Sequence, residues 1–173
     1  SDLGALSCNP SIGGPGKSQM VAEITALGGV MGRAADKSGI HWRTLNASHG
    51  AATQALRAQI DRDLYHNAIV DILGEYEKLT IQYETVSDLD LKNAIVNNKY
   101  HATAIVLTTG TFLDGVVTRG DEKISAGRLQ DDGTYQNADN KTSKTLVENG
   151  FKLLRLKTGT PARIRRDSID FSV

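Results

Sequence analysis

A run of four apolar residues near the middle of the chain constrains the fold most. Residues 104–107 read AIVL and are followed at once by the polar turn TTGT. Strands buried on both faces of a sheet have continuous apolar runs of this kind and are typical of α/β proteins. Ligands of open α/β sheets bind beyond the carboxyl ends of such strands. The pattern therefore predicts an α/β fold, with either a ligand-binding turn or an ordinary exit turn after this strand.

A glycine-rich loop near the start of the chain follows directly after the only cysteine, Cys8. Residues 9–18 read NPSIGGPGKS, but a phosphate-binding P-loop would need a glycine where Ser11 stands. We therefore do not expect a nucleoside triphosphatase. Gly13, Gly14 and Gly16 permit backbone conformations that are closed to other residues. They indicate either a bound group that approaches the main chain closely or a flexible surface turn.

Composition argues against several classes of function. The 173 residues include 20 Lys+Arg and 20 Asp+Glu, so the chain has no broad positive field for a polyanion. No apolar run approaches the roughly 20 residues that span a bilayer, and we expect no membrane segment. A single cysteine excludes an internal disulfide. The histidines form no HxxxH pair, and we expect no metal site.

Hydrophobic periodicity predicts the remaining elements. We expect an amphipathic helix over residues 16–35, with a kink or early end at Gly28 and Gly29, and a longer helix over 52–76. Residues 36–50 predict a loop with one short extended piece, and residues 78–91 a strand. A mobile polar loop is expected over 127–144, then a short helix over 142–149 capped by Gly150. A strand from residue 151, a TGTP turn and a basic tail follow, and this tail is either a phosphate contact or a solvated face.

Several stretches, in this order, resemble one family. They read LSCNPSIGGPGK, RAQIDRDLY, AIVLTTGTFLDG, SAGR and RLKTGTPARI, the last followed by SIDFSV. These stretches are similar to the glucose-inhibited division protein A family (MnmG), flavin-dependent enzymes that modify tRNA uridine with a 5-carboxymethylaminomethyl group.

The resemblance implies an α/β fold, a partial FAD/NAD(P)-binding (Rossmann-like) domain of the two-dinucleotide-domain flavoprotein type with a small β-meander insertion. Residues 1–173 would be a partial FAD-binding domain, and residues 120–150 a variable polar loop and short helix. The family's GxGxxG turn, which holds the FAD pyrophosphate at a helix N-terminus, would lie upstream of Ser1. The chain would then be an internal fragment and inactive alone.

The resemblance also implies a reaction at C5 of the wobble uridine of tRNA. The cofactor would be FAD, with NAD(P)H and methylene-tetrahydrofolate as co-substrates. A GTPase of the MnmE type would be a partner and the whole protein a homodimer without a membrane segment, in the bacterial cytoplasm or, in a eukaryote, the mitochondrion. Cys8 would then be a thiolate that adds to C6 of the uracil and activates C5. A role in acid–base or flavin chemistry, or an inert buried cysteine, are the alternatives.

The family's motifs carry a set of site residues onto this chain. The catalytic set would be Cys8, Asn9 and Lys17, with Gly13 and Gly14 beside the flavin. Main-chain groups of Val86, Thr109, Gly110 and Thr111 would contact FAD. Substrate or phosphate contacts would be Arg57, Asp61, Lys157, Thr158, Gly159, Thr160 and Arg163, although Arg57 and Asp61, one helical turn apart in the expected helix, could instead pair with each other.

The chain also departs from the family's pattern. Asp139 falls near the position of a flavin-contacting serine, where an acidic side chain facing FAD phosphate would be repelled. The interval between Leu91 and residue 104 is short, so the meander is expected to have lost a hairpin. These departures leave open a degenerate non-catalytic paralogue or interaction module. A folate- and FAD-dependent tRNA uracil-5 methyltransferase is a further alternative.

Overall fold

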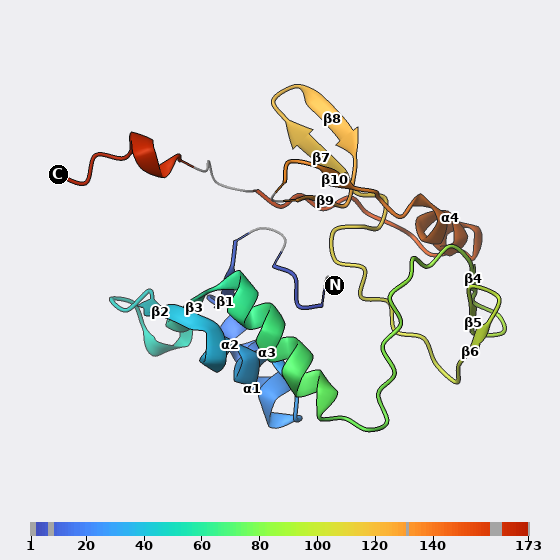
Figure 1. The fold of residues 1–173 in the computed structure, drawn as a ribbon, viewed down its shortest axis with the longest axis horizontal. Helices are drawn as coiled ribbons and strands as arrows, with labels where there is room; N and C mark the ends of the chain where they lie inside the picture. The colour runs from blue at the N-terminus through green and yellow to red at the C-terminus, as the bar shows by residue number, and fades with distance from the viewer. Residues whose placement is uncertain (1–2, 7–8, 131, 160–163, 173) are drawn as a thin grey trace. The chain divides into compact units, whose positions relative to one another are not determined.

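The computed structural model describes residues 3–6, 9–130, 132–159 and 164–172. The chain divides into two compact units, Ser1–Gln82 with Thr160–Val173, and Tyr83–Gly159 (Figure 1). Each unit is described separately below.

The first unit is built on a small antiparallel sheet. Its strands are β1 (Ser11–Gly13), β2 (Gly39–Leu45) and β3 (Ala55–Ile60), in the order β1-β3-β2. The central strand β3 pairs with both neighbours, so that Ala58 lies opposite Ile12 on one side and opposite Trp42 on the other. A short 3₁₀ turn, η1 (Ala51–Thr53), precedes β3.

Three helices, α1 (Lys17–Ala26), α2 (Met31–Ser38) and α3 (Arg62–Gly74), complete this unit. The break expected at the glycine pair is confirmed. Gly28 has a φ of 86°, and the amides of Gly28 and Gly29 donate to the carbonyls of Thr25 and Ile24. This pair of bonds is the Schellman arrangement that ends a helix at a left-handed glycine.

The core of the first unit lies where α2 and α3 meet the sheet. Side chains of both helices and of β3 pack together there with almost no exposure: Ala34, Ala35, Ala58, Ile60, Tyr65, Ala68, Ile69 and Ile72. Burial of the aromatic ring raises the pKa of the Tyr65 phenol. The core thus holds β3 between its two partners and α3 across it.

The helix expected over residues 52–76 is wrong in its first half. Residues 55–60 form β3, and α3 begins only after Asp61. The carboxylate of Asp61 accepts hydrogen bonds from the amides of Asp63 and Leu64, which is the preferred way to start a helix. The extended piece expected within the loop over 36–50 is present but longer than expected, because β2 occupies seven of these residues.

The second unit contains short antiparallel elements and one helix. A three-stranded meander consists of β4 (Leu89–Asp90), β5 (Ile95–Val96) and β6 (Tyr100–His101). A hairpin joins β7 (Val116–Arg119) to β8 (Glu122–Ser125), and β9 (Arg128–Leu129) pairs with β10 (Tyr135–Gln136). The helix α4 (Asn140–Glu148) follows. A 3₁₀ turn, η2 (Arg166–Ser168), lies in the carboxyl-terminal segment, which is grouped with the first unit.

Three predicted strands do not form. Residues 104–107 and 151–159 contain no strand. Of residues 78–91, only Leu89 and Asp90 are in a strand, the short β4. Val106 is 84% exposed and Leu154 87% exposed. These segments have no neighbouring strand in the described chain to accept their backbone hydrogen bonds, and without a ladder apolar residues do not make a sheet.

The loop expected over 127–144 is corrected and the helix after it is confirmed. Strands β9 and β10 and the start of α4 occupy much of that loop. The helix begins at Asn140, two residues earlier than expected. Gly150 follows its end with a φ of 86°, in the left-handed conformation expected of a terminating glycine.

Candidate functional site

The glycine loop is anchored to the central strand of the sheet. The amide of Gly14 donates to the Leu56 carbonyl at 2.8 Å, and a Cβ on Gly13 would lie 2.3 Å from that carbonyl oxygen. The φ of Gly13 is 89° and that of Gly14 is 99°. Gly13 is therefore required by the chain's own close approach to β3, whereas a Cβ on Gly16 would meet nothing within 4 Å.

Lys17 follows this loop as the first residue of α1. Its amide donates to the Gly14 carbonyl at 3.0 Å, and the left-handed Gly16, with a φ of 72°, occupies the N-cap position. The Ser18 amide donates to the same carbonyl at 2.9 Å, so the glycine loop itself satisfies the first two amides of α1. What the loop leaves exposed here is the Lys17 side chain, a cation that suits an anionic group.

Asn9, just before β1, and Arg57, within β3, are each bonded to a different residue of the small sheet. The side-chain amide of Gln59 donates to Asn9 Oδ1 at 3.4 Å, and the Arg57 guanidinium donates to Ser11 Oγ at 3.0 Å. Cys8 lies outside the described residues. Its neighbour Asn9 and the following Pro10, whose carbonyl accepts from the Ile60 amide at 2.8 Å, both connect the cysteine segment to β3.

Arg57 and Asp61 do not lie one helical turn apart on one helix, as the expected helix would have placed them. Arg57 belongs to β3, and Asp61 is the N-cap of α3. The expectation of a pair one helical turn apart is wrong, because residues 57–60 are extended. The Asp61 carboxylate is used by the amides of the helix that it starts.

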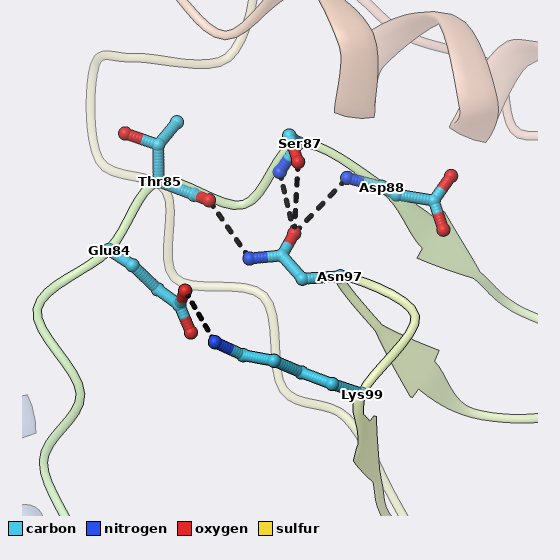
Figure 2. Close-up of polar contacts among 6 residues, drawn as sticks. All are labelled: Glu84, Thr85, Ser87, Asp88, Asn97 and Lys99. Atoms are coloured by element: carbon cyan, nitrogen blue, oxygen red, sulfur yellow. Dashed lines mark hydrogen bonds and ion pairs between the residues drawn. The ribbon is translucent and has the colours of Figure 1, made fainter.

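Val86 lies in a segment that one asparagine side chain fixes to the meander (Figure 2). The Oδ1 atom of Asn97 accepts from the amides of Ser87 at 2.7 Å and Asp88 at 3.2 Å, and its Nδ2 donates to the Thr85 carbonyl at 3.0 Å. The Asn97 amide also donates to the Asp88 carbonyl at 2.9 Å. The residues on both sides of Val86 are thus fixed by a side chain that the sequence analysis did not single out.

A charged pair supports the same segment. Lys99 Nζ lies 2.9 Å from a carboxylate oxygen of Glu84 (Figure 2). It also lies 4.6 Å from the centre of the Tyr100 ring. Hydrogen bonds from Tyr100 and then from Lys99 lower the pKa of Glu84. Hydrogen bonds with Tyr100 and then with Glu84 raise the pKa of Lys99. Asn97 and Asn98 were the signal in the sequence for this turn, since asparagine tolerates the left-handed conformation of tight turns.

The threonine-rich turn after residue 107 is formed although the strand before it is not. The Phe112 amide donates to the Thr109 carbonyl at 3.0 Å, and Thr111 Oγ1 donates to the Gly127 carbonyl at 2.6 Å. Gly110 has a φ of 57°, and a Cβ there would meet nothing within 4 Å. The main chain of Gly110 is therefore open, while the Thr111 hydroxyl is already used.

The remaining predicted residues divide between described and undescribed positions. Lys157, Thr158 and Gly159 are exposed in a segment without secondary structure, and Thr160 and Arg163 lie outside the described residues. The first unit thus contains Asn9, Gly13, Gly14, Lys17, Arg57 and Asp61, and the second contains Val86, the 109–111 turn and residues 157–159.

Asp139 has a role that the sequence analysis did not expect. Its carboxylate accepts from the amides of Lys141 and Thr142 and caps α4. Its charge faces the positive end of its own helix, where a carboxylate is stabilised. The Asp139 amide also donates to the Phe112 carbonyl, and the Asp139 carbonyl accepts from the Asp114 amide. A serine at this position would cap the helix in the same way.

The described residues form no cluster of three or more histidine, cysteine or acidic side chains that could hold a metal ion. No helix within the described ranges is long and apolar enough to cross a membrane. Within the second unit, the open left-handed Gly110 and the fixed segment around Val86 each present main-chain groups of the kind that contact a bound cofactor.

Comparison with known proteins identifies the class. Two crystal forms of GidA from Aquifex aeolicus, form II and form I, each align with this chain at a TM-score of 0.83 and 41% identity. Each alignment covers 99% of this chain and 29% of the GidA chain. The mixed α/β chain therefore has part of the fold of an FAD-binding flavoprotein with two dinucleotide-binding domains. All of residues 1–173 also match the family model described as "Glucose inhibited division protein A". The chain belongs to this family, whose members are flavoproteins of tRNA modification.

Proposed function

We propose that this chain is part of an FAD-dependent enzyme that installs a carboxymethylaminomethyl-type group at C5 of the wobble uridine of tRNA. The observation that carries the proposal is the match to the family over the whole of residues 1–173. The co-substrates are NAD(P)H and methylene-tetrahydrofolate, and the partner is a GTPase of the MnmE type. The native enzyme is a homodimer.

Cys8 is the nucleophile of this proposal. C5 of uracil is a weak nucleophile until a thiolate adds at C6 and moves electron density to C5. C5 then forms a bond to the electrophilic one-carbon unit and loses its proton, and cleavage of the sulfur–C6 bond restores the double bond and the thiolate. Asn9 orients the segment next to Cys8 through its bond with Gln59. The Lys17 ammonium is available to stabilise negative charge that develops on the uracil.

The cofactor contacts of this proposal are main-chain contacts. FAD, when bound, supplies the redox chemistry of the reaction. Gly110 presents open left-handed backbone to it, and Val86 offers its own amide and carbonyl between residues that Asn97 fixes. The amide and carbonyl of Gly14 are already bonded within the first unit, to Leu56 and to the amides of Lys17 and Ser18. Lys157, Thr158, Gly159, Thr160 and Arg163 contact phosphate groups of the cofactor or the tRNA. Asp139 is no objection, because its carboxylate caps α4.

The first test is the absorbance of the native protein purified from its source. A stoichiometric flavin band at about 450 nm is expected. The second is nucleoside analysis of tRNA from cells that carry Cys8→Ser, in which the modified wobble uridine should disappear while the flavin band stays. A protein that remains colourless with added FAD would overturn the enzyme and leave the interaction module.

A further inference from the structure

The sheet of the first unit has one covered face, and the other face is polar except at its Ala55–Leu45 end. Side chains alternate across a strand, and Ile12, Ala58 and Ile60 point toward the core formed by α2 and α3. The alternate positions therefore lie on the opposite face. We call this set the basic sheet face: Ser11, His41, Arg43, Arg57 and Gln59.

The basic sheet face carries two arginines directly opposite each other. Arg43 and Arg57 are partners in the β2–β3 ladder, and their Cβ atoms are about 5 Å apart in such a pair. Like charges in this position destabilise a sheet. Arg57 donates to the neutral hydroxyl of Ser11, and none of the described residues at outward positions of the three strands carries a carboxylate.

Two other arginines, by contrast, have acidic partners. Arg33 lies 3.0 Å from Glu75, and Arg155 lies 2.7 Å from Asp114. The opposed pair on the basic sheet face has a repulsion that an anion bound by both arginines would offset. Guanidinium groups bind phosphate oxygens in a bidentate manner, so phosphate suits this position.

The basic sheet face is continuous with the segment next to Cys8. Gln59 lies opposite Ser11 in β1 and opposite His41 in β2, and its amide bonds to Asn9. We infer that Arg43 and Arg57 bind a backbone phosphate of the RNA strand next to the target uridine, with His41 beside them. This inference rests on the proposed function, because it takes tRNA as the substrate.

The test is the salt dependence of tRNA binding by the native protein. Each phosphate contact contributes about 0.7 to 0.9 to the slope of log K against log salt. Arg43→Gln should lower the magnitude of the slope by about that amount, which is about five- to eightfold weaker binding at 0.1 M salt. Arg43→Lys keeps the charge and should restore most of the slope. The matched control is Arg33→Gln, an exposed arginine paired with Glu75, which should leave the slope unchanged.

The outcomes separate this inference from the function on which it rests. A wild-type protein with no measurable affinity for tRNA would overturn the proposed function, and the inference with it. Wild-type binding with an unchanged slope in Arg43→Gln would overturn the inference alone. A slope lowered equally by Arg33→Gln would also overturn it, because the effect would then be one of net charge rather than of this face.

Discussion

Strand β3 and residues 104–107 are both short and largely apolar, yet only one of them is a strand. In β3, Ala58 and Ile60 are each 2% exposed, whereas Val106 is 84% exposed. The difference is in their neighbours. Strand β3 has β1 on one side and β2 on the other, and residues 104–107 have no adjacent strand in the described chain. An apolar run therefore shows what a segment can become, and the available partners decide whether it does.

The largest expected effect tests this contrast directly. Ile72 is fully buried, and Ile72→Ala should lower the free energy of unfolding of the chain by about 2–5 kcal/mol through lost packing and a cavity. Val106→Ala, at an exposed position, should change it by less than about 0.5 kcal/mol. Urea titrations followed by far-ultraviolet circular dichroism measure both values. Equal losses would mean that residues 104–107 are buried in solution.

The second prediction concerns how the segment around Val86 is fixed. Asn97→Gly keeps the left-handed backbone, with φ near 52°, and removes the amide that binds Thr85, Ser87 and Asp88. A few net hydrogen bonds of about 1 kcal/mol each would be lost. Protection of the Ser87 and Asp88 amides against hydrogen exchange should fall about tenfold or more.

Asn98→Gly is the matched control for that change. Asn98 has a φ of 55°, and no hydrogen bond joins its side chain to the described residues 84–88. Its replacement should leave the two amides protected. If both variants lose protection to the same degree, the turn itself, and not the Asn97 amide, fixes the segment.

The fold was predictable from the sequence where a local signal ends or starts an element. The glycine pair at 28–29 correctly predicted the break between α1 and α2. The helix over 52–76 was overextended because Leu56, Ile60 and Leu64 recur at a spacing of four. In the structure this spacing crosses the boundary at Asp61, from a strand with a period of two to a helix. Asp61 followed by a helical pattern was a readable N-cap signal that the apolar stripe obscured.

The candidate site was predictable only as a list of residues. Sequence motifs indicated Asn9, Arg57 and Val86, but not what supports them. The bonds from Gln59, Ser11 and Asn97 come from strand register and from a turn 11 residues beyond Val86, which depend on tertiary pairing. Asp139 was taken as a hindrance to a cofactor because the helix was predicted to begin at residue 142, two residues too late to make Asp139 its N-cap.

The third prediction concerns the two helix caps, one in each unit. Asp61→Ala and Asp139→Ala should each lower the free energy of unfolding by about 0.5–2 kcal/mol, because two amides at each helix start lose their acceptor. Asp61→Asn and Asp139→Ser keep an acceptor and should cost far less. Thermal unfolding of the four variants provides the values. A loss for Asp139→Ser as large as that for Asp139→Ala would remove capping as the role of Asp139.

The smallest effect is the pH dependence of the exposed pair beside Val86. Hydrogen bonds from Tyr100 and Lys99 lower the pKa of Glu84 below its ordinary value of 4.5. The folded state therefore favours the carboxylate, so this contribution is present at pH values above 4.5 and is lost as the pH falls through the lowered pKa.

Because the Tyr100 hydrogen bond is the larger cause, Tyr100→Phe should raise the pKa of Glu84 more than Lys99→Met does. Carboxyl-detected NMR titration of Glu84 in the three proteins measures this order, and an identical titration in all three would show that Glu84 is bound by neither residue in solution. If the pKa of Glu84 rises in both variants, these polar contacts at the surface support the Val86 segment of the second unit. The first unit is held instead by its buried core.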